Sequence, residues 1–277
     1  MKKILAPCDF SKTAINAFRF ALDVAMQSKG TVHLLNIIEL PVIHDPIIMP
    51  VLTFEQDFLK ELKEKALAEF NKIITKYNQE GVKVVLNVEF GSPARMITEF
   101  VEKNSIDLII MGSHGASGFR EYFVGSNAEK VVRHSAVPVL VMKRYYKGPI
   151  KSIVFPNILD TENQEDLIMK VKALQTFFKA KVHILYVNTP TNFTSDTVTL
   201  ARLKEFTKRF MFKDYTINIY NHPYKEDGII HFTKSIKGNL IAMGTHGRKG
   251  ISHLLNGSLA EDVVNHSDCP IWTYTLK

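Results

Sequence analysis

The sequence predicts an α/β fold, with two tandem doubly wound domains that each contain a five-stranded parallel sheet. Short apolar runs rich in β-branched residues alternate with amphipathic runs of helical period along the whole chain. Residues 107–143 recur at 239–275, with 16 identities in 37 positions at a constant offset of 132. The 277 residues are enough for two domains of ordinary size.

The first copy begins with an apolar strand, after which Ser11 can N-cap a helix that Gly30 closes. A second strand follows, and then a long helix whose apolar residues recur every three to four positions until Gly81 stops it. The remaining strands and helices alternate. We expect strands at 2–8, 31–38, 82–90, 107–113 and 137–143, and helices at 12–28, 58–77, 92–104 and 126–135.

The second copy repeats this order, and Thr161 and Gln164 have the spacing of a capping box before its first helix. The offset between copies is 149 at the first prolines, Pro7 and Pro156, but 132 at the glycines, so the second copy lacks 17 residues upstream of its glycines. We expect strands at 151–157, 181–187, 214–220, 239–245 and 269–275, and helices at 165–180, 196–211, 226–236 and 258–267.

Alternating strands and helices indicate a parallel sheet with helices on both faces. With the strand order 3-2-1-4-5, strands one and four are neighbours whose crossovers leave in opposite directions, and ligands bind at the carboxyl ends of strands at such a point. Asp9 ends the first strand and Gly112 ends the fourth. We therefore expect both at one site, although Asp9 alone also fits an exposed strand end or a helix cap.

The glycines of the repeat have a spacing that suits phosphate. Gly112 and Gly115 are followed, nine residues later, by Gly125 and Ser126 at a predicted helix start. Glycine lets the backbone approach an anion, and a helix N-terminus offers free N–H groups. A tight turn with a helix cap is the alternative. Neither a P-loop nor a dinucleotide-binding fingerprint is present.

The segments "ILAPCDFS" and "MGSHG…VGSNAEKVVRHSAVPVLVMK" resemble the universal stress protein family, whose nucleotide-binding members have a G-2x-G-9x-G-(S/T) motif. The resemblance covers nearly all of residues 1–145 and is weaker but continuous over 150–276. It implies a tandem protein, with domains at 1–145 and 149–277 that form a pseudo-dimer.

The resemblance also assigns roles in binding ATP, with Mg²⁺ possible at the phosphates. Asp9 and Ile37 match positions that hold adenosine, and Gly112 matches one at the ribose. Asn127 and Ala128 depart from the family pattern, which puts one phosphate contact in doubt. The first-copy site is expected to comprise Pro7, Cys8, Asp9, Ile37, Met111, Gly112, His114, Gly115, Gly125, Ser126 and Asn127.

The second copy keeps the glycines but changes the adenosine end. Ile158 aligns with Asp9, and Asn157 aligns with Cys8. An apolar side chain cannot accept hydrogen bonds from a nucleoside, so we expect weak or altered binding there. The phosphate cradle is expected at Gly244, Gly247, Gly257 and Ser258.

His114 and His246 lie within the glycine loops and could act as acid or base, but we favour a role in fixing the loop because no partner carboxylate is identifiable. We therefore assign no catalytic residue. No histidine set has a metal-ligand spacing, so no metal site is expected. His134 and His266 are expected near helix C-termini, where positive charge is favourable.

Charge and composition narrow the possible partners and the cellular location of the protein. The net charge of +7 divides into +2 for residues 1–146 (18 basic, 16 acidic) and +5 for 147–277 (17 basic, 12 acidic), without a dense basic tract. We expect no nucleic-acid partner, no membrane segment and a cytoplasmic location, where Cys8 and Cys269 are free thiols. Residues 143–148 read as a solvated connector.

Two further segments bear on assembly. Residues 40–56 are apolar with three prolines, and they suit a lid, a docking surface or packing against the second domain. The last strands of the two copies resemble the edge strands through which this family pairs its domains, so we expect intramolecular pairing. A homodimer of the whole chain is also possible.

The function expected from these features is that of an ATP-binding stress-response protein, a nucleotide-dependent sensor or regulator with an unidentified protein partner. One alternative is a slow Mg-dependent ATPase. The other is an interaction module that binds no nucleotide. We expect Gly115→Val to abolish nucleotide binding in the first domain while the fold survives.

Overall fold

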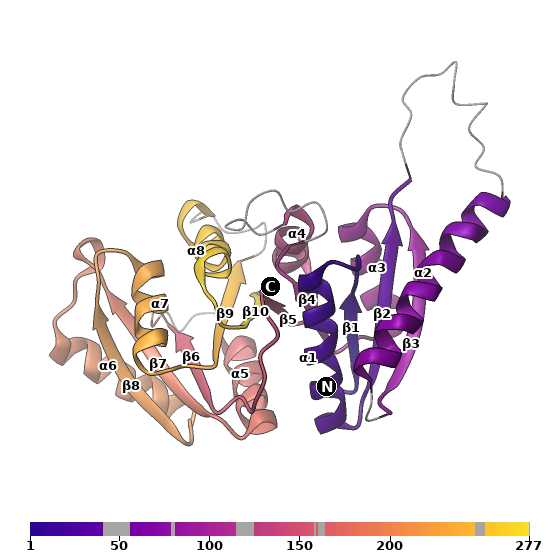
Figure 1. Cartoon of the computed structure of the whole chain (residues 1–277). Helices are drawn as coiled ribbons and strands as arrows, with labels where there is room; N and C mark the ends of the chain where they lie inside the picture. Colours follow the sequence, from indigo (N-terminus) through magenta and orange to yellow (C-terminus); the bar gives the residue numbers. More distant parts are fainter. Residues whose placement is uncertain are drawn as a thin grey trace, which may run out of the picture.

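The structure is a computed structural model, and it describes residues 1–40, 56–78, 81–114, 125–157, 159, 164–246 and 253–276. Strands and helices alternate along the chain, as predicted (Figure 1). The strands are β1 Lys3–Pro7, β2 Thr31–Ile38, β3 Lys83–Phe90, β4 Leu108–Gly112, β5 Val139–Met142, β6 Ser152–Pro156, β7 Lys181–Asn188, β8 Tyr215–Asn221, β9 Leu240–His246 and β10 Ile271–Leu276.

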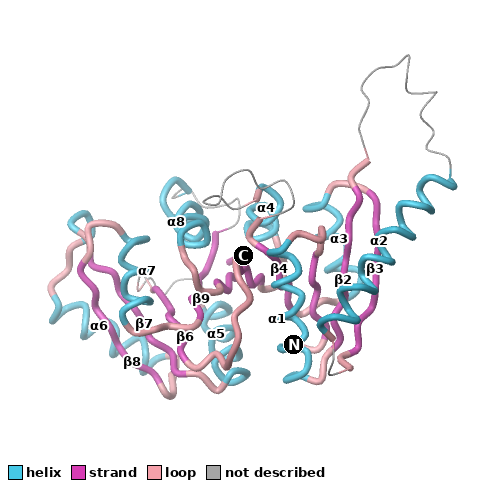
Figure 2. Tube along the Cα trace, in the orientation of Figure 1, coloured by secondary structure: helices cyan, strands magenta, loops and turns pink. Residues whose placement is uncertain are grey.

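The helices connect these strands along the chain and lie beside the sheet (Figure 2). They are α1 Lys12–Ser28, α2 Gln56–Tyr77, α3 Pro93–Asn104, α4 Ser126–His134, α5 Glu165–Phe178, the 3-10 turn η2 Pro190–Asn192, α6 Asp196–Arg209, α7 Lys225–Ser235 and α8 His253–His266. We call residues 1–145 the first half and residues 149–277 the second half. Within the described parts of the chain, none of the helices is both long and apolar enough to cross a membrane.

The ten strands of the described residues form one sheet, in the order β3-β2-β1-β4-β5-β10-β9-β6-β7-β8. Neighbouring strands are parallel within each half. At the centre, β5 and β10 pair antiparallel, with Trp272 opposite Leu140. The α/β prediction is confirmed, and the two expected edge strands pair with each other within the chain.

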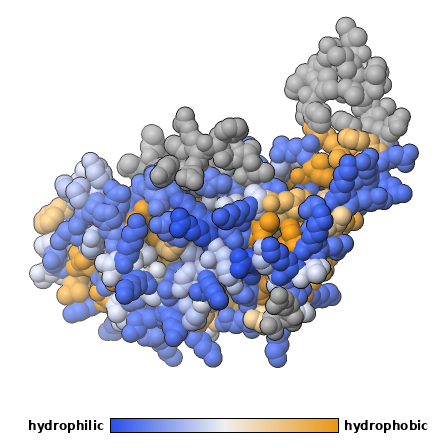
Figure 3. All heavy atoms as spheres, viewed as in Figure 1, coloured by the Kyte–Doolittle hydropathy of each residue, from blue (hydrophilic) through white to orange (hydrophobic). Residues whose placement is uncertain are grey.

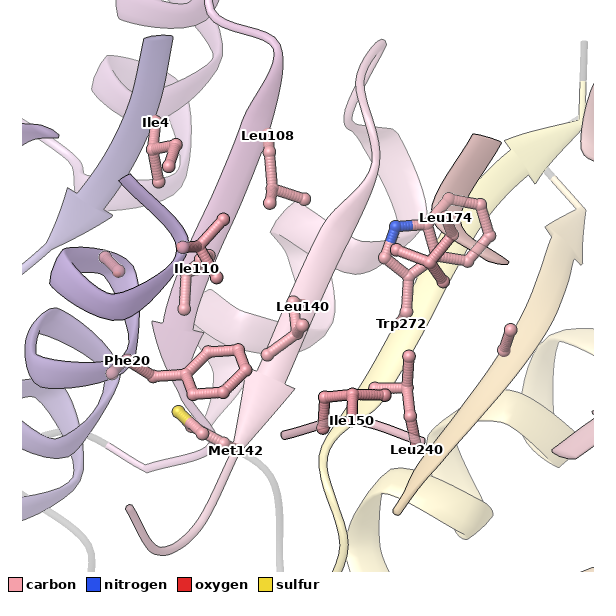
Figure 4. Close-up of a cluster of buried hydrophobic side chains, with 14 of the residues drawn as sticks. Ile4, Phe20, Leu108, Ile110, Leu140, Met142, Ile150, Leu174, Leu240 and Trp272 are labelled. Atoms are coloured by element: carbon pink, nitrogen blue, oxygen red, sulfur yellow. The ribbon is translucent and has the colours of Figure 1, made fainter. Parts of the chain in front are cut away.

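Helices cover both faces of the sheet, and each face has one apolar core that extends across both halves. Side chains from α1, α2, α5 and α6 belong to one buried cluster. Side chains from α3, α4, α7 and α8 belong to the other. Figure 4 shows Leu140 of β5 and Trp272 of β10 in the first of these clusters, close to the junction of the halves. On the face drawn in Figure 3, hydrophilic surface separates the apolar patches.

Three local expectations have a definite outcome. Ser11 caps α1 as predicted, because its side-chain oxygen accepts the N–H of Ala14 at 3.2 Å. The connector is less solvated than expected, since the Tyr145 hydroxyl donates to Asp23 at 2.8 Å and Arg19 lies 3.8 Å from the Tyr145 ring. Gln164 is the N-cap of α5, not its third residue as a capping box requires. Residues 41–55 lie outside the described residues.

Helix α8 begins earlier than predicted, at His253 instead of Ser258. Its added first turn, His253-Leu254-Leu255-Asn256, has no proline to prevent it. The expected helix C-termini are found, because His134 ends α4 and His266 ends α8.

Candidate functional site

A cavity of about 300 Å³ opens at the carboxyl ends of β1, β2 and β4 in the first half. Ten of the eleven site residues expected there line it: Pro7, Cys8, Asp9, Ile37, Met111, Gly112, His114, Gly125, Ser126 and Asn127. The eleventh, Gly115, lies outside the described residues. The fold thus brings together residues more than a hundred positions apart.

Seven further residues line the cavity and were not among the expected site residues, although Ala128 had been noted as a departure from the family pattern: Ala14, Leu35, Glu39, Pro93, Ile97, Ser113 and Ala128. Glu39 matters most, because it adds a second carboxylate. Its signal in the sequence was its place directly after the second strand, beside the strand that ends near Asp9.

Asp9 shapes the turn between β1 and α1. Its Oδ1 accepts the N–H of Ser11 at 3.1 Å, and Phe10 between them has a positive φ of 65°. The next strand helps to hold this turn, because the Asn36 amide donates to the Cys8 carbonyl at 2.9 Å. Asp9 therefore orders the turn and also lines the cavity, whereas Ser11 caps the helix.

Cys8 lines the cavity as a neutral thiol. The pKa of Cys8 is raised to about 12, mainly by burial and in small part by the charge of Asp9, although a backbone hydrogen bond at Phe10 opposes the shift. Because the thiolate is the nucleophilic form of cysteine, Cys8 is unreactive at neutral pH.

Gly112 has a structural reason to be glycine. A Cβ placed there would lie 2.8 Å from the carbonyl carbon of Thr13 and 2.9 Å from the backbone nitrogen of Ala14. The first turn of α1 thus packs directly on β4 at this position. The absence of a side chain is required for that contact, whatever binds in the cavity.

The N-terminus of α4 points donors at the same cavity. Gly125 is its N-cap, with extended backbone (φ −61°, ψ 141°), and its own N–H donates to the Ser113 carbonyl at 2.7 Å. The next N–H groups, of Ser126, Asn127 and Ala128, have no acceptor among the described residues. Three donors without an acceptor in the described part of the chain, at a positive helix end, suit an anion.

His114 lies beside these donors. Its Nδ1 shares a hydrogen bond of 2.7 Å with Ser113 Oγ, and its carbonyl accepts from the Thr13 hydroxyl. Its Nε2 is buried without a partner among the described residues. Burial, and then the charge of Lys143, lower the pKa of His114, so the ring is neutral at neutral pH. These contacts hold the start of the glycine loop in place.

The charges in this cavity are arranged along the sheet. The carboxylates of Asp9 and Glu39 lie on the side of β1 and β2, whereas the donors of α4 lie beyond β4. A ligand that fits has hydrogen-bond donors at one end and negative charge at the other. Among the described residues, no three His, Cys, Asp or Glu side chains lie close enough to hold a metal ion.

The second half has a larger cavity of about 450 Å³ at the corresponding ends of β6, β7 and β9. Met243 and Gly244 line it, in the places that Met111 and Gly112 have in the first half. Gly257 and Ser258 lie inside α8 and not at its start. Gly247 and Ile158 lie outside the described residues, and His246 is the last residue of β9.

Comparison with known proteins gives consistent matches. The model of the Universal stress protein family matches residues 1–143 and 219–274. Universal stress protein MJ0531 of Methanocaldococcus jannaschii is 31% identical over 144 residues, which are 52% of this chain and 82% of that protein. Universal stress protein MJ0577 of the same organism is 33% identical over 154 residues, which cover 52% of this chain and 95% of that protein.

A solved structure matches the chain from end to end. The crystal structure of a universal stress protein from Archaeoglobus fulgidus DSM 4304 covers 99% of this chain and 98% of its own, with a TM-score of 0.77. The sequence identity is 20%, so this match concerns the fold.

Proposed function

This chain belongs to the universal stress protein family, and on that premise we propose that the cavity of the first half binds an adenine nucleotide, with ATP as its ligand. The bound nucleotide makes the protein a sensor or regulator in a cytoplasmic stress response, acting on a protein partner. The free thiols of Cys8 and Cys269 fit that reducing compartment.

One observation carries the proposal: a single cavity has carboxylates at one end and, at the other, three backbone donors that have no acceptor among the described residues. The phosphates of ATP suit the N–H groups of Ser126, Asn127 and Ala128. The hydroxyl groups of the ribose and the amine of the base are donors, and they suit the carboxylates of Asp9 and Glu39.

The residues around the cavity support binding more than turnover. His114 has no carboxylate partner among the described residues, and Cys8 is protonated. A phosphoryl-transfer enzyme needs a group that positions the attacking water and cations that neutralise the developing charge. Mg²⁺ brought in by the triphosphate supplies one such charge, and ADP that accumulates on the purified protein would make the protein a slow ATPase.

The first experiment measures the adenine nucleotide that denaturation releases from freshly purified protein. We expect about one nucleotide per chain, because the two cavities differ at the nucleoside end. A protein that releases none and takes up no added Mg-ATP would contradict the proposal and leave an interaction module.

Calorimetry on two variants of Ser126 then locates the phosphates. Ser126→Pro removes the first N–H donor of α4, and the extended backbone of Gly125 suits a following proline. We expect ATP affinity to fall about tenfold or more, since a charge-assisted hydrogen bond contributes about 1.5–3 kcal/mol. Ser126→Ala removes only the hydroxyl and is the matched control. Equal affinity of wild type and Ser126→Pro would place the phosphates elsewhere.

A further inference from the structure

We propose that the cavity of the second half binds a small organic monoanion with a planar apolar body, of which an aromatic carboxylate is the simplest example. This site is separate from the proposed nucleotide pocket. The proposal holds whether or not the first half binds ATP.

The walls of this cavity combine a polar group of side chains with apolar side chains that come from the sheet and both helical layers. The apolar side chains include Leu167, Leu185, Val187, Ile229, Met243, Leu259 and Leu276. Phe193 also lines the cavity, yet 74% of its surface is exposed. An exposed aromatic ring beside an apolar cavity gains burial when a planar ligand stacks on it.

A chain of hydrogen bonds fixes the orientation of one polar group in the wall. The Leu159 N–H donates to Asn157 Oδ1 at 2.6 Å, so the Asn157 amide nitrogen faces the other way and donates to Gln164 Oε1 at 3.0 Å. Gln164 is only 7% exposed, and its amide nitrogen has no acceptor among the described residues. Because Gln164 lines the cavity, this amide can donate to a ligand that brings an acceptor.

The charge of this cavity is opposite to that of the first. Lys225, the first residue of α7, is the one charged side chain among the described residues that line it. With the Asn192 amide oriented to satisfy both its atoms, Lys225 Nζ donates to the Asn192 side-chain oxygen at 2.8 Å. Of the two acidic residues that follow Lys225, Glu226 pairs with His266.

A carboxylate matches these groups better than a phosphate does. One ammonium group compensates one negative charge, and the two carboxylate oxygens can accept from Lys225 and from Gln164. A second negative charge would have no cation among the described lining residues.

The backbone also disfavours a nucleotide at this site. Because α8 begins at His253, the N–H of Gly257 is the fifth of the helix and bonds within it. The donors that α4 offers at Ser126 therefore have no counterpart at Ser258. In addition, no carboxylate lies among the described lining residues to accept from a nucleoside.

The test uses the full chain and calorimetric titration with 2-naphthoate, with its neutral amide, 2-naphthamide, as the matched probe. We expect 2-naphthoate to bind at one site per chain and the amide to bind at least tenfold more weakly. Saturating Mg-ATP should leave the affinity for 2-naphthoate unchanged. Absence of binding, equal binding of both probes, or displacement of 2-naphthoate by Mg-ATP would each overturn the proposal.

Two lysine variants then locate the charge. Lys225→Met keeps the length of the side chain and should lower the affinity for 2-naphthoate at least tenfold without affecting 2-naphthamide. Lys234→Met makes the same charge change in the last turn of α7 and should leave both affinities unchanged. Similar losses in both variants, or none in Lys225→Met with the fold intact by circular dichroism, would place the anion elsewhere.

Discussion

Gly112 and Gly244 occupy equivalent positions in the two halves, but different atoms surround them. A Cβ on Gly112 would meet backbone atoms of α1, which cannot move without the helix. A Cβ on Gly244 would instead meet the end of the Leu167 side chain at 2.8 Å and that of Leu276 at 3.4 Å. Side-chain ends can change rotamer, so the second position has more freedom.

This difference predicts unequal costs for the same substitution. We expect Gly112→Ala to destabilise the protein by about 2–3 kcal/mol through overpacking against Thr13 and Ala14. Gly244→Ala should cost about 1 kcal/mol or less, because Leu167 can give way. Urea denaturation of both variants measures the two values. Equal losses would show that backbone contact with α1 is not the reason for glycine at 112.

Three partly buried histidines predict how stability depends on pH. Burial is the main cause that lowers the pKa of His33, His114 and His183 below 6.5, helped by nearby positive charge. Below pH 6.5 the unfolded chain therefore binds more protons than the folded one, and the free energy of unfolding falls on acidification. Urea denaturation at pH 7.5 and pH 5.5 should show the lower midpoint at pH 5.5. A higher midpoint at pH 5.5 would contradict these pKa directions.

Most of the first-half site could be predicted from residue types, because strand ends and glycine spacing locate a switch point without coordinates. Glu39 was missed, although its place directly after the second strand is a signal by which it could have been found. In the sequence comparison of the two copies, Ile158 aligns with Asp9. The structure shows that the Asn157 side chain accepts the N–H of the residue two positions later, as the Asp9 side chain does. In the sequence alignment, however, Asn157 stands opposite Cys8 and not opposite Asp9. Such a shift depends on side-chain geometry and leaves no trace in an ungapped comparison.

At the scale of elements, helix caps give a second matched test. Ser11 Oγ accepts the Ala14 N–H at the start of α1, whereas Ser92 at the start of α3 makes no side-chain capping bond. We expect Ser11→Ala to cost about 1 kcal/mol of stability and Ser92→Ala less than about 0.5 kcal/mol. Thermal or urea unfolding gives both values. The cap argument fails if Ser92→Ala proves the more costly change.

Element boundaries were predicted well where strong periodicity or a stop residue exists. The start of α8 was not, because Gly257 and Ser258 look like the helix start found at Gly125 and Ser126. Identical residues begin a helix in one half and lie within a helix in the other. The five residues before each glycine differ between the copies at every position.

At the scale of the whole molecule, the sequence indicated that two edge strands pair, but not that the cores merge. Pairing of β5 with β10 aligns two sheets, so apolar side chains of both halves pack in the same two clusters. The Val132 carbonyl of α4 also accepts from the hydroxyls of Thr275 at 3.2 Å and Thr245 at 3.5 Å. These contacts tie the first-half helix at the candidate site to the ends of β9 and β10.

Continuous cores predict that both halves unfold together. Trp272 is the single tryptophan, is 1% exposed and lies opposite Leu140 at the junction, so its fluorescence reports on that junction. We expect the fluorescence change to coincide with the loss of far-ultraviolet circular dichroism in urea. Thr275→Val removes the hydrogen bond to Val132 across the junction and also the one that Thr275 accepts from the Thr245 hydroxyl. With both probes, the free energy of unfolding should fall by the same amount, about 1–2 kcal/mol. Two separate transitions by circular dichroism, with only one accompanied by a fluorescence change, would mean that each half is stable without the shared sheet.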